Sequence, residues 1–202
     1  MRNQTTKNQK SFTQPHFCIR KSGAGFTLIE MMVAVAIFSL MVGTIINIFM
    51  WGIREQRRAL ATQKLLDETS YALEYMSRSI RMAKKDDVSG VNCLTGDKTN
   101  YEITARGGLR FVNYKNECQE FFSKNNQLKE EKAGSTLPMT STNTKIEALR
   151  FSLIGQNQPP TDNLQPRVTI FLDIKGAGQK PEEKPQIKIQ TTISQRNLDI
   201  QY

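Results

Sequence analysis

Residues 26–53 decide the fold: Phe26-Thr27-Leu28-Ile29-Glu30 is followed by MMVAVAIFSLMVGTIINIFMWGI, from Met31 to Ile53. The second part is 23 residues long and carries no charge. As an α-helix it would extend roughly 34 Å, which is enough to cross the hydrocarbon of a bilayer. Trp51, the only tryptophan, lies near the far end, where interfacial aromatic residues gather. The stretch therefore predicts a membrane-spanning helix.

Three other interpretations of this stretch compete with a membrane span. Its length argues against a buried core helix. A removable secretory signal has an apolar core of about 7–15 residues followed by a small-residue cleavage site. Ala59-Leu60-Ala61 has suitable residues but lies beyond three arginines, and the apolar core is too long. A simple signal anchor is the main alternative and stays open at this point.

Basic residues are concentrated before the apolar stretch. Residues 1–25 contain five Lys or Arg and no acidic residue, which is more than half of the net charge of +9. Segments rich in Lys and Arg stay in the cytoplasm. We therefore expect a cytoplasmic N-terminus, with the bulk of the chain outside. Arg54, Arg57 and Arg58 weaken this contrast without reversing it.

An acidic residue, Glu30, stands near the start of this otherwise uncharged helix, where a carboxylate is costly and usually functional. The run Gly25-Phe26-Thr27-Leu28-Ile29-Glu30 joins a basic leader to a long apolar helix that contains Ala34, Ala36, Ile37 and Phe38. In this order of features the chain resembles the type IV pilin and type II secretion pseudopilin superfamily. Within it, the chain looks most like a J-type minor pseudopilin or a minor pilin.

The resemblance implies a structural subunit rather than an enzyme. A prepilin peptidase would cleave between Gly25 and Phe26, Phe26 would become N-methylated, and Glu30 would serve assembly. The expected partners are other pilin or pseudopilin subunits, the peptidase, an inner-membrane assembly platform and membrane lipid. The subunit would first be a single-pass protein of the bacterial cytoplasmic membrane and then part of an envelope or surface filament.

The remainder of the chain predicts an α+β fold, in which the long helix packs on an antiparallel β-sheet. No proline occurs between Pro15 and Pro138, and apolar residues recur at three- and four-residue steps after the span. The expected stripe consists of Leu65, Leu66, Thr69, Ala72, Leu73, Met76, Ile80 and Ala83. We expect a leader at 1–25, a transmembrane or filament-core helix at 26–53, its amphipathic continuation at 54–84, and a sheet domain at 85–202.

Strands are predicted in the last part of the chain by alternating apolar residues. The clearest surround Ile146–Ile154, Val168–Ile174 and Ile187–Ile193, and weaker candidates are Tyr101–Ala105, Leu109–Tyr114 and Glu120–Ser123. Gly107-Gly108 predicts a hairpin turn. Strands follow one another without intervening helices, so the sheet should be antiparallel, with one face on the helix.

Three cysteines become an even pair after processing, because Cys18 would leave with the leader. Outside the cytoplasm, Cys93 and Cys118 would be expected to form a disulfide. The alternative is two free, partly buried thiols.

Catalytic, cofactor and metal sites are not predicted. The only histidine, His16, lies in the leader, and no phosphate loop or nucleophile elbow occurs. Asp86-Asp87 and Glu130-Glu131 are better explained as solvated pairs than as calcium ligands. Basic residues of the helix alternate with acidic ones, which favours a solvated face over a nucleic-acid partner. A competence-type minor pilin that contacts DNA is nevertheless kept as an alternative.

Overall fold

The structure is a computed structural model that describes residues 25–86, 93–95, 98–158, 162–178, 180–181 and 184–197. The leader residues 1–24 lie outside the described residues, as do residues 87–90, which belong to the stretch Lys85–Gly90 where the paired charges and Gly90 predict a break in the helix. The chain divides into two compact units, Met1–Asn47 and Ile48–Tyr202. Helix α1, Leu28–Arg81, supplies most of the described part of the first unit and the N-terminal element of the second.

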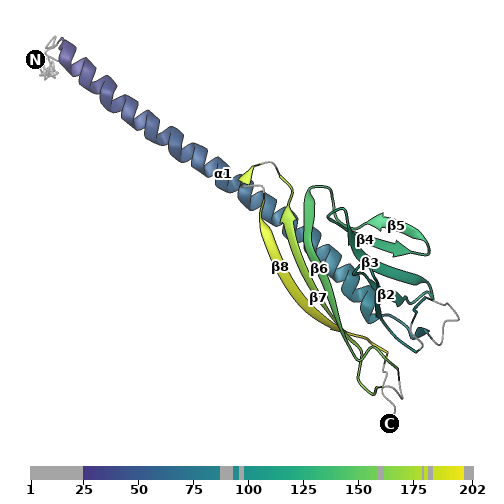
Figure 1. Ribbon diagram of the computed structural model, residues 1–202. Coiled ribbons are helices and arrows are strands. Elements are labelled where there is room, and N and C mark those ends of the chain that lie inside the picture. Colours follow the sequence, from purple (N-terminus) through teal and green to yellow (C-terminus); the bar gives the residue numbers. More distant parts are fainter. Residues whose placement is uncertain are drawn as a thin grey trace, which may run out of the picture. The chain divides into compact units, whose positions relative to one another are not determined.

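The structure confirms the predicted α+β architecture, in which the helix packs against antiparallel sheets (Figure 1). Eight strands follow α1 in the described residues: β1 (Glu102–Ile103), β2 (Leu109–Val112), β3 (Cys118–Lys124), β4 (Gln127–Lys132), β5 (Ser135–Pro138), β6 (Thr144–Ile154), β7 (Arg167–Gly176) and β8 (Gln186–Ser194).

The strands form two sheets rather than the single predicted sheet. One has five strands in the order β1-β2-β3-β4-β5, and the other has three in the order β6-β7-β8. All neighbours are antiparallel and consecutive in sequence, so each sheet is a meander. The two sheets adjoin where the Ile146 N–H donates to the carbonyl oxygen of Asn126 at 2.8 Å.

The helix buries one stripe in this unit. Its buried residues lie at three- and four-residue steps: Leu65, Thr69, Ala72, Met76 and Ile80. The predicted stripe is therefore confirmed in its centre, but Leu66 at its edge is 45% exposed. The stripe is narrower than predicted because a helix turns by about 100° per residue and Leu66 points away from the sheets.

One apolar core joins the helix to both sheets. Phe111 and Phe121 come from the five-stranded sheet, and Ile170 and Leu172 come from the three-stranded sheet. They are fully buried with Met76 of α1. Both sheets and the helix bury apolar side chains in this one core, so they are expected to fold together.

The end of α1 is fixed by hydrogen bonds from distant segments. Tyr101 Oη donates to the carbonyl oxygen of Ile80 at 2.8 Å, and the Arg196 N–H donates to that of Arg81 at 2.8 Å. Gln195 Nε2 donates to the carbonyl oxygen of Ala83 at 3.0 Å. The last carbonyl groups of a helix have no partner within the helix. Here Tyr101 and two residues much later in the chain, Gln195 and Arg196, supply partners for the carbonyl groups at this end of the helix.

Candidate functional site

The candidate site begins where α1 begins. The Glu30 N–H donates to Thr27 Oγ1 at 3.3 Å and to the Thr27 carbonyl oxygen at 3.1 Å. Thr27 is therefore the N-cap of the helix, and Glu30 is its third residue. Thr-x-x-Glu is the sequence of a capping box, in which the first side chain bonds to the backbone of the fourth residue. Glu30 was predicted near the start of the helix, and the structure confirms this position. The capping role of Thr27 was not predicted, although the Thr-x-x-Glu spacing was its signal.

Gly25 and Phe26 precede the cap and are exposed. The Phe26 residue is 76% exposed. A Cβ added to Gly25 would meet no heavy atom within 4 Å among the described residues. The described fold therefore does not require glycine at this position.

Apolar side chains cover the whole surface of α1 up to the end of the predicted span. Residues 25–52 are all exposed, including Phe38, Phe49 and Trp51. By length and composition, α1 is apolar enough to cross a membrane. Exposed apolar surface of this extent needs lipid or other helices as a neighbour.

Polar side chains within the apolar stretch are satisfied by their own helix. Ser39 Oγ donates to the carbonyl oxygen of Val35 at 2.7 Å, and Thr44 Oγ1 donates to that of Met41 at 2.8 Å. Asn47 Nδ2 donates to the carbonyl oxygen of Gly43 at 2.9 Å. Each bond lowers the cost of placing a polar group in hydrocarbon. Glu30 therefore stands out, because a carboxylate has no N–H or O–H to donate in this way.

Residues 20–46 match the family described as the prokaryotic N-terminal methylation motif. The matched segment contains Gly25, Phe26 and Glu30. The chain thus carries a prepilin-type methylation motif, which supports a pilin or pseudopilin. No curated protein and no solved structure matches the chain. The motif and the apolar helix together support a membrane-anchored protein that is cleaved by a prepilin peptidase and assembles with other pilin subunits.

The cysteines lie away from this motif, in the sheet domain. Cys93 and Cys118 are joined by a disulfide with an S–S distance of 2.03 Å and a Cα–Cα distance of 5.4 Å. They pack with Leu94 and Val112 in a small apolar cluster separate from the main core. The bridge ties the segment after the helix to the first residue of β3.

An ion-pair cluster lies on the outer face of the five-stranded sheet. Arg106 Nε donates to Glu120 Oε1 at 2.6 Å, and Arg110 Nη2 donates to Glu120 Oε2 at 2.9 Å. The Arg106 guanidinium also lies 3.8 Å from the centre of the Phe122 ring. Burial raises the pKa of Glu120, but hydrogen bonds from Arg106, Thr104 and Arg110 and the charge of Arg106 outweigh it, so this pKa is lowered. These contacts fix the β1–β2 hairpin. The role of the cluster is therefore structural.

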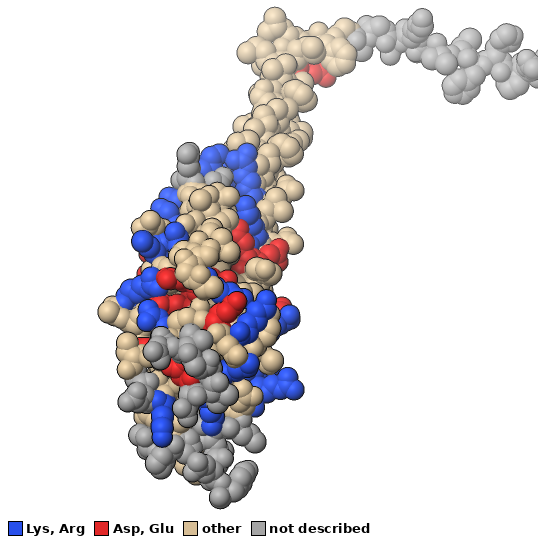
Figure 2. Space-filling model, turned by 90° about the vertical axis from the view of Figure 1, so that its right-hand side faces the viewer, with Lys and Arg blue, Asp and Glu red and all other residues tan. Residues whose placement is uncertain are grey.

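Over the body of the sheet domain, basic and acidic side chains are mixed on the face seen in Figure 2, so they form no surface of one sign there. In the part of the chain that the structure describes, no group of three His, Cys, Asp or Glu side chains could hold a metal ion.

The two glutamates predicted to be a solvated pair, Glu130 and Glu131, both have side-chain partners in the fold. Glu130 accepts hydrogen bonds from Tyr75 and Gln119, and Glu131 pairs with Arg106.

Proposed function

We propose that this protein is a minor pilin or pseudopilin, made as a prepilin and polymerised into an envelope filament. The match of residues 20–46 to the methylation motif, on a helix whose apolar surface is uncovered, carries this proposal. The finer likeness to J-type minor pseudopilins rests on the length of the chain and the sequence around Leu66–Lys84. The work of the protein is assembly: the membrane stores the subunit, and an assembly platform moves its apolar helix into the core of a filament.

The proposed order along the chain is a leader at 1–25, a membrane and filament-core helix at 26–53, its continuation at 54–84 and a sheet domain at 85–202. The leader lies in the cytoplasm and the sheet domain lies outside the cytoplasmic membrane. Cleavage between Gly25 and Phe26 occurs on the cytoplasmic side, so the product keeps its apolar helix. Glycine before the cut lets the peptidase approach the backbone closely. This agrees with the absence of any described contact that would require glycine at position 25.

Intact-mass analysis of the protein from its native host tests this proposal. We expect a chain that begins at Phe26 and carries one additional methyl group on its amine. Replacing Gly25→Val should leave most of the protein with its leader, because the branched side chain blocks the approach. Gly25→Ala is the matched control, and we expect it to be cleaved more readily than the valine variant. A wild-type mass that retains Met1–Gly25 would contradict the proposal.

A further inference from the structure

Basic residues follow directly where the apolar stretch ends. Arg54, Arg57 and Arg58 are exposed and lie at i, i+3 and i+4, which places them on one side of α1. Arg54 follows Trp51 by three residues, about 4.5 Å along the helix axis. In a membrane, these guanidinium groups would therefore lie at the depth of the lipid headgroups. Among the described residues, none of the three is engaged in an ion pair.

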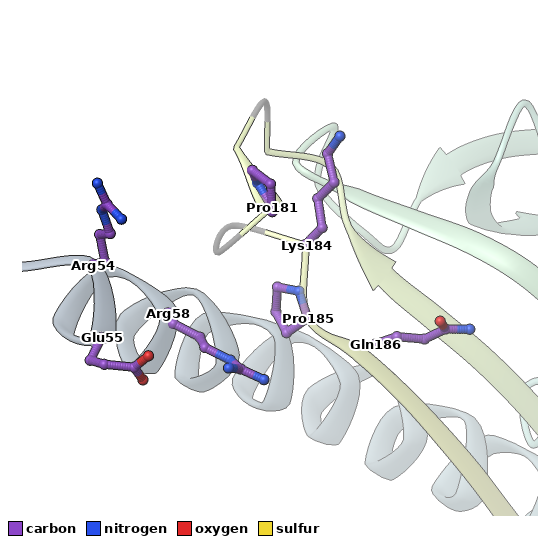
Figure 3. A pocket seen from close by; sticks show the side chains of 7 residues that line it. All are labelled: Arg54, Glu55, Arg58, Pro181, Lys184, Pro185 and Gln186. Atoms are coloured by element: carbon purple, nitrogen blue, oxygen red, sulfur yellow. The ribbon is translucent and has the colours of Figure 1, made fainter. Parts of the chain in front are cut away.

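A second element brings further cations to the same place. The loop between β7 and β8 contributes Lys184 and Pro185 to a pocket of about 460 Å³ that Arg54 and Arg58 also line (Figure 3). Five exposed cations, three from this part of the helix and two from this loop, form what we call the basic collar: Arg54, Arg57, Arg58, Lys180 and Lys184.

An adjoining pocket joins this charge to apolar surface. Its volume is about 400 Å³, and its lining consists of Met50 and Ile53 beside Arg54, Arg57 and Lys180. One wall can therefore contact hydrocarbon, while the other carries positive charge. A free phosphate ion or an acidic peptide would use only the charged wall. A phospholipid uses both, because its phosphate lies directly above its acyl chains.

We infer that the basic collar binds the headgroup phosphates of anionic phospholipids in the leaflet that surrounds Trp51. Arginine suits this role because its planar guanidinium donates two parallel hydrogen bonds to a phosphate. The collar seats the sheet domain on the membrane surface while the subunit awaits assembly. Binding of lipid phosphates gives the three arginines a function. Membrane orientation does not explain them, since positive charge on this side opposes the orienting effect of the leader.

Acidic residues in the same two segments of the sequence limit the positive charge that the collar can offer. Glu55 lines the first pocket, and the loop sequence also contains Glu182 and Glu183, which lie outside the described residues. In the sequence of the two segments 54–58 and 180–184, five basic residues stand against three acidic ones. Replacing Glu182→Gln and Glu183→Gln together should therefore strengthen the lipid preference.

Trp51 is the only tryptophan and reports directly on lipids beside the collar. The full chain is placed in vesicles of equal parts phosphatidylglycerol and phosphatidylcholine, and the quencher bromine is carried by the acyl chains of one lipid or the other. We expect brominated phosphatidylglycerol to quench Trp51 fluorescence about twofold more than brominated phosphatidylcholine, and added salt to reduce this difference. The triple variant R54Q, R57Q and R58Q should be quenched equally by both.

The matched control removes three other exposed cations, with K124Q, K145Q and R150Q on strands β3 and β6. It should keep the wild-type preference. Equal quenching of the wild-type protein by the two lipids would overturn the inference and leave the proposed function intact. The inference rests on membrane insertion of α1. Absence of quenching by either lipid would overturn that insertion and the inference with it.

Discussion

Glu120 shows how a single buried charge is accommodated on the outer face of a sheet. Its side chain is 3% exposed, yet both oxygens accept hydrogen bonds from arginines. Glycine is required beside it, since a Cβ on Gly108 would collide with Glu120 Oε1 and would lie 2.9 Å from Phe122 Cβ. The hairpin turn predicted at Gly107-Gly108 is confirmed, with Gly107 at φ +75°. The two adjacent glycines predicted the turn, but no pattern of residues predicted the buried carboxylate beside it.

Replacing Glu120→Gln should lower the free energy of unfolding by about 2–3 kcal/mol, because two arginines lose a charged partner while the shape is kept. The matched control is Glu74→Gln on α1, which removes an exposed ion pair with Arg78. Such a pair contributes less than about 1 kcal/mol. Denaturant unfolding of the purified protein measures both. Equal effects of the two substitutions would contradict the structural role of Glu120.

The lowered pKa of Glu120 also predicts a pH dependence. A carboxyl whose pKa is lower in the folded state stabilises the fold above its unfolded pKa, near 4.3, and loses that effect as the pH falls through the folded value. The difference in stability between the wild-type protein and Glu120→Gln should therefore be largest near neutral pH. It should shrink below about pH 5. Unfolding midpoints measured at several pH values test this, and a difference that grows on acidification would contradict it.

At the scale of elements, the amphipathic part of α1 depends on one narrow stripe. Met76 is fully buried among residues of both sheets, whereas Leu66 is 45% exposed. Met76→Ala should lower the free energy of unfolding by about 2–4 kcal/mol, and Leu66→Ala by less than about 1 kcal/mol. Both substitutions leave a good helix former in place, so their difference isolates burial. Thermal unfolding of the two variants measures this difference, and equal losses would show that the stripe is wider than the structure has it.

Elements built on apolar periodicity could be predicted, and those built on polar contacts could not. Helix α1 and strands β6, β7 and β8 follow clear patterns. Strand β4 has the sequence QLKEEK, in which only Leu128 reaches the main core. Its Glu130 is buried because Tyr75 and Gln119 donate to it, a partnership between distant residues. Strand β5 is exposed throughout, so no burial pattern marks it. The division into two sheets was not predicted either, because it also depends on contacts between residues far apart in the sequence.

The disulfide acts between elements, because Cys93 follows the helix and Cys118 begins β3. Closing a loop over a sequence separation of 25 residues restricts the unfolded chain and stabilises the fold by roughly 3–4 kcal/mol. The double substitution Cys93→Ser and Cys118→Ser should lose about this much. Thiol labelling of denatured, unreduced mature protein should find no reactive thiol. Two reactive thiols per chain would show that the bridge does not form in the exported protein.

At the scale of the whole molecule, processing and assembly meet at the N-terminus of α1. Cleavage after Gly25 would create a cationic amine on Phe26, about one helical turn before Glu30. The apolar surface that follows is exposed, and in the proposed filament it would be covered by the same surface of neighbouring subunits. A lone carboxylate buried there would be costly. Pairing with the Phe26 amine of an axially shifted neighbour would remove that cost and disfavour other registers.

Glu30→Gln separates this role from folding, because glutamine also satisfies the capping box that Thr27 forms at this position. The helix start, membrane insertion, cleavage and the sheet domain should therefore be unchanged. Incorporation into isolated filaments should fall about tenfold or more, since the neighbour's buried amine loses its charged partner. The matched control is Glu147→Gln, which removes an exposed carboxylate on β6 and should assemble normally. Wild-type incorporation of Glu30→Gln would refute the pairing, and failure of insertion or cleavage would place the role of Glu30 before assembly.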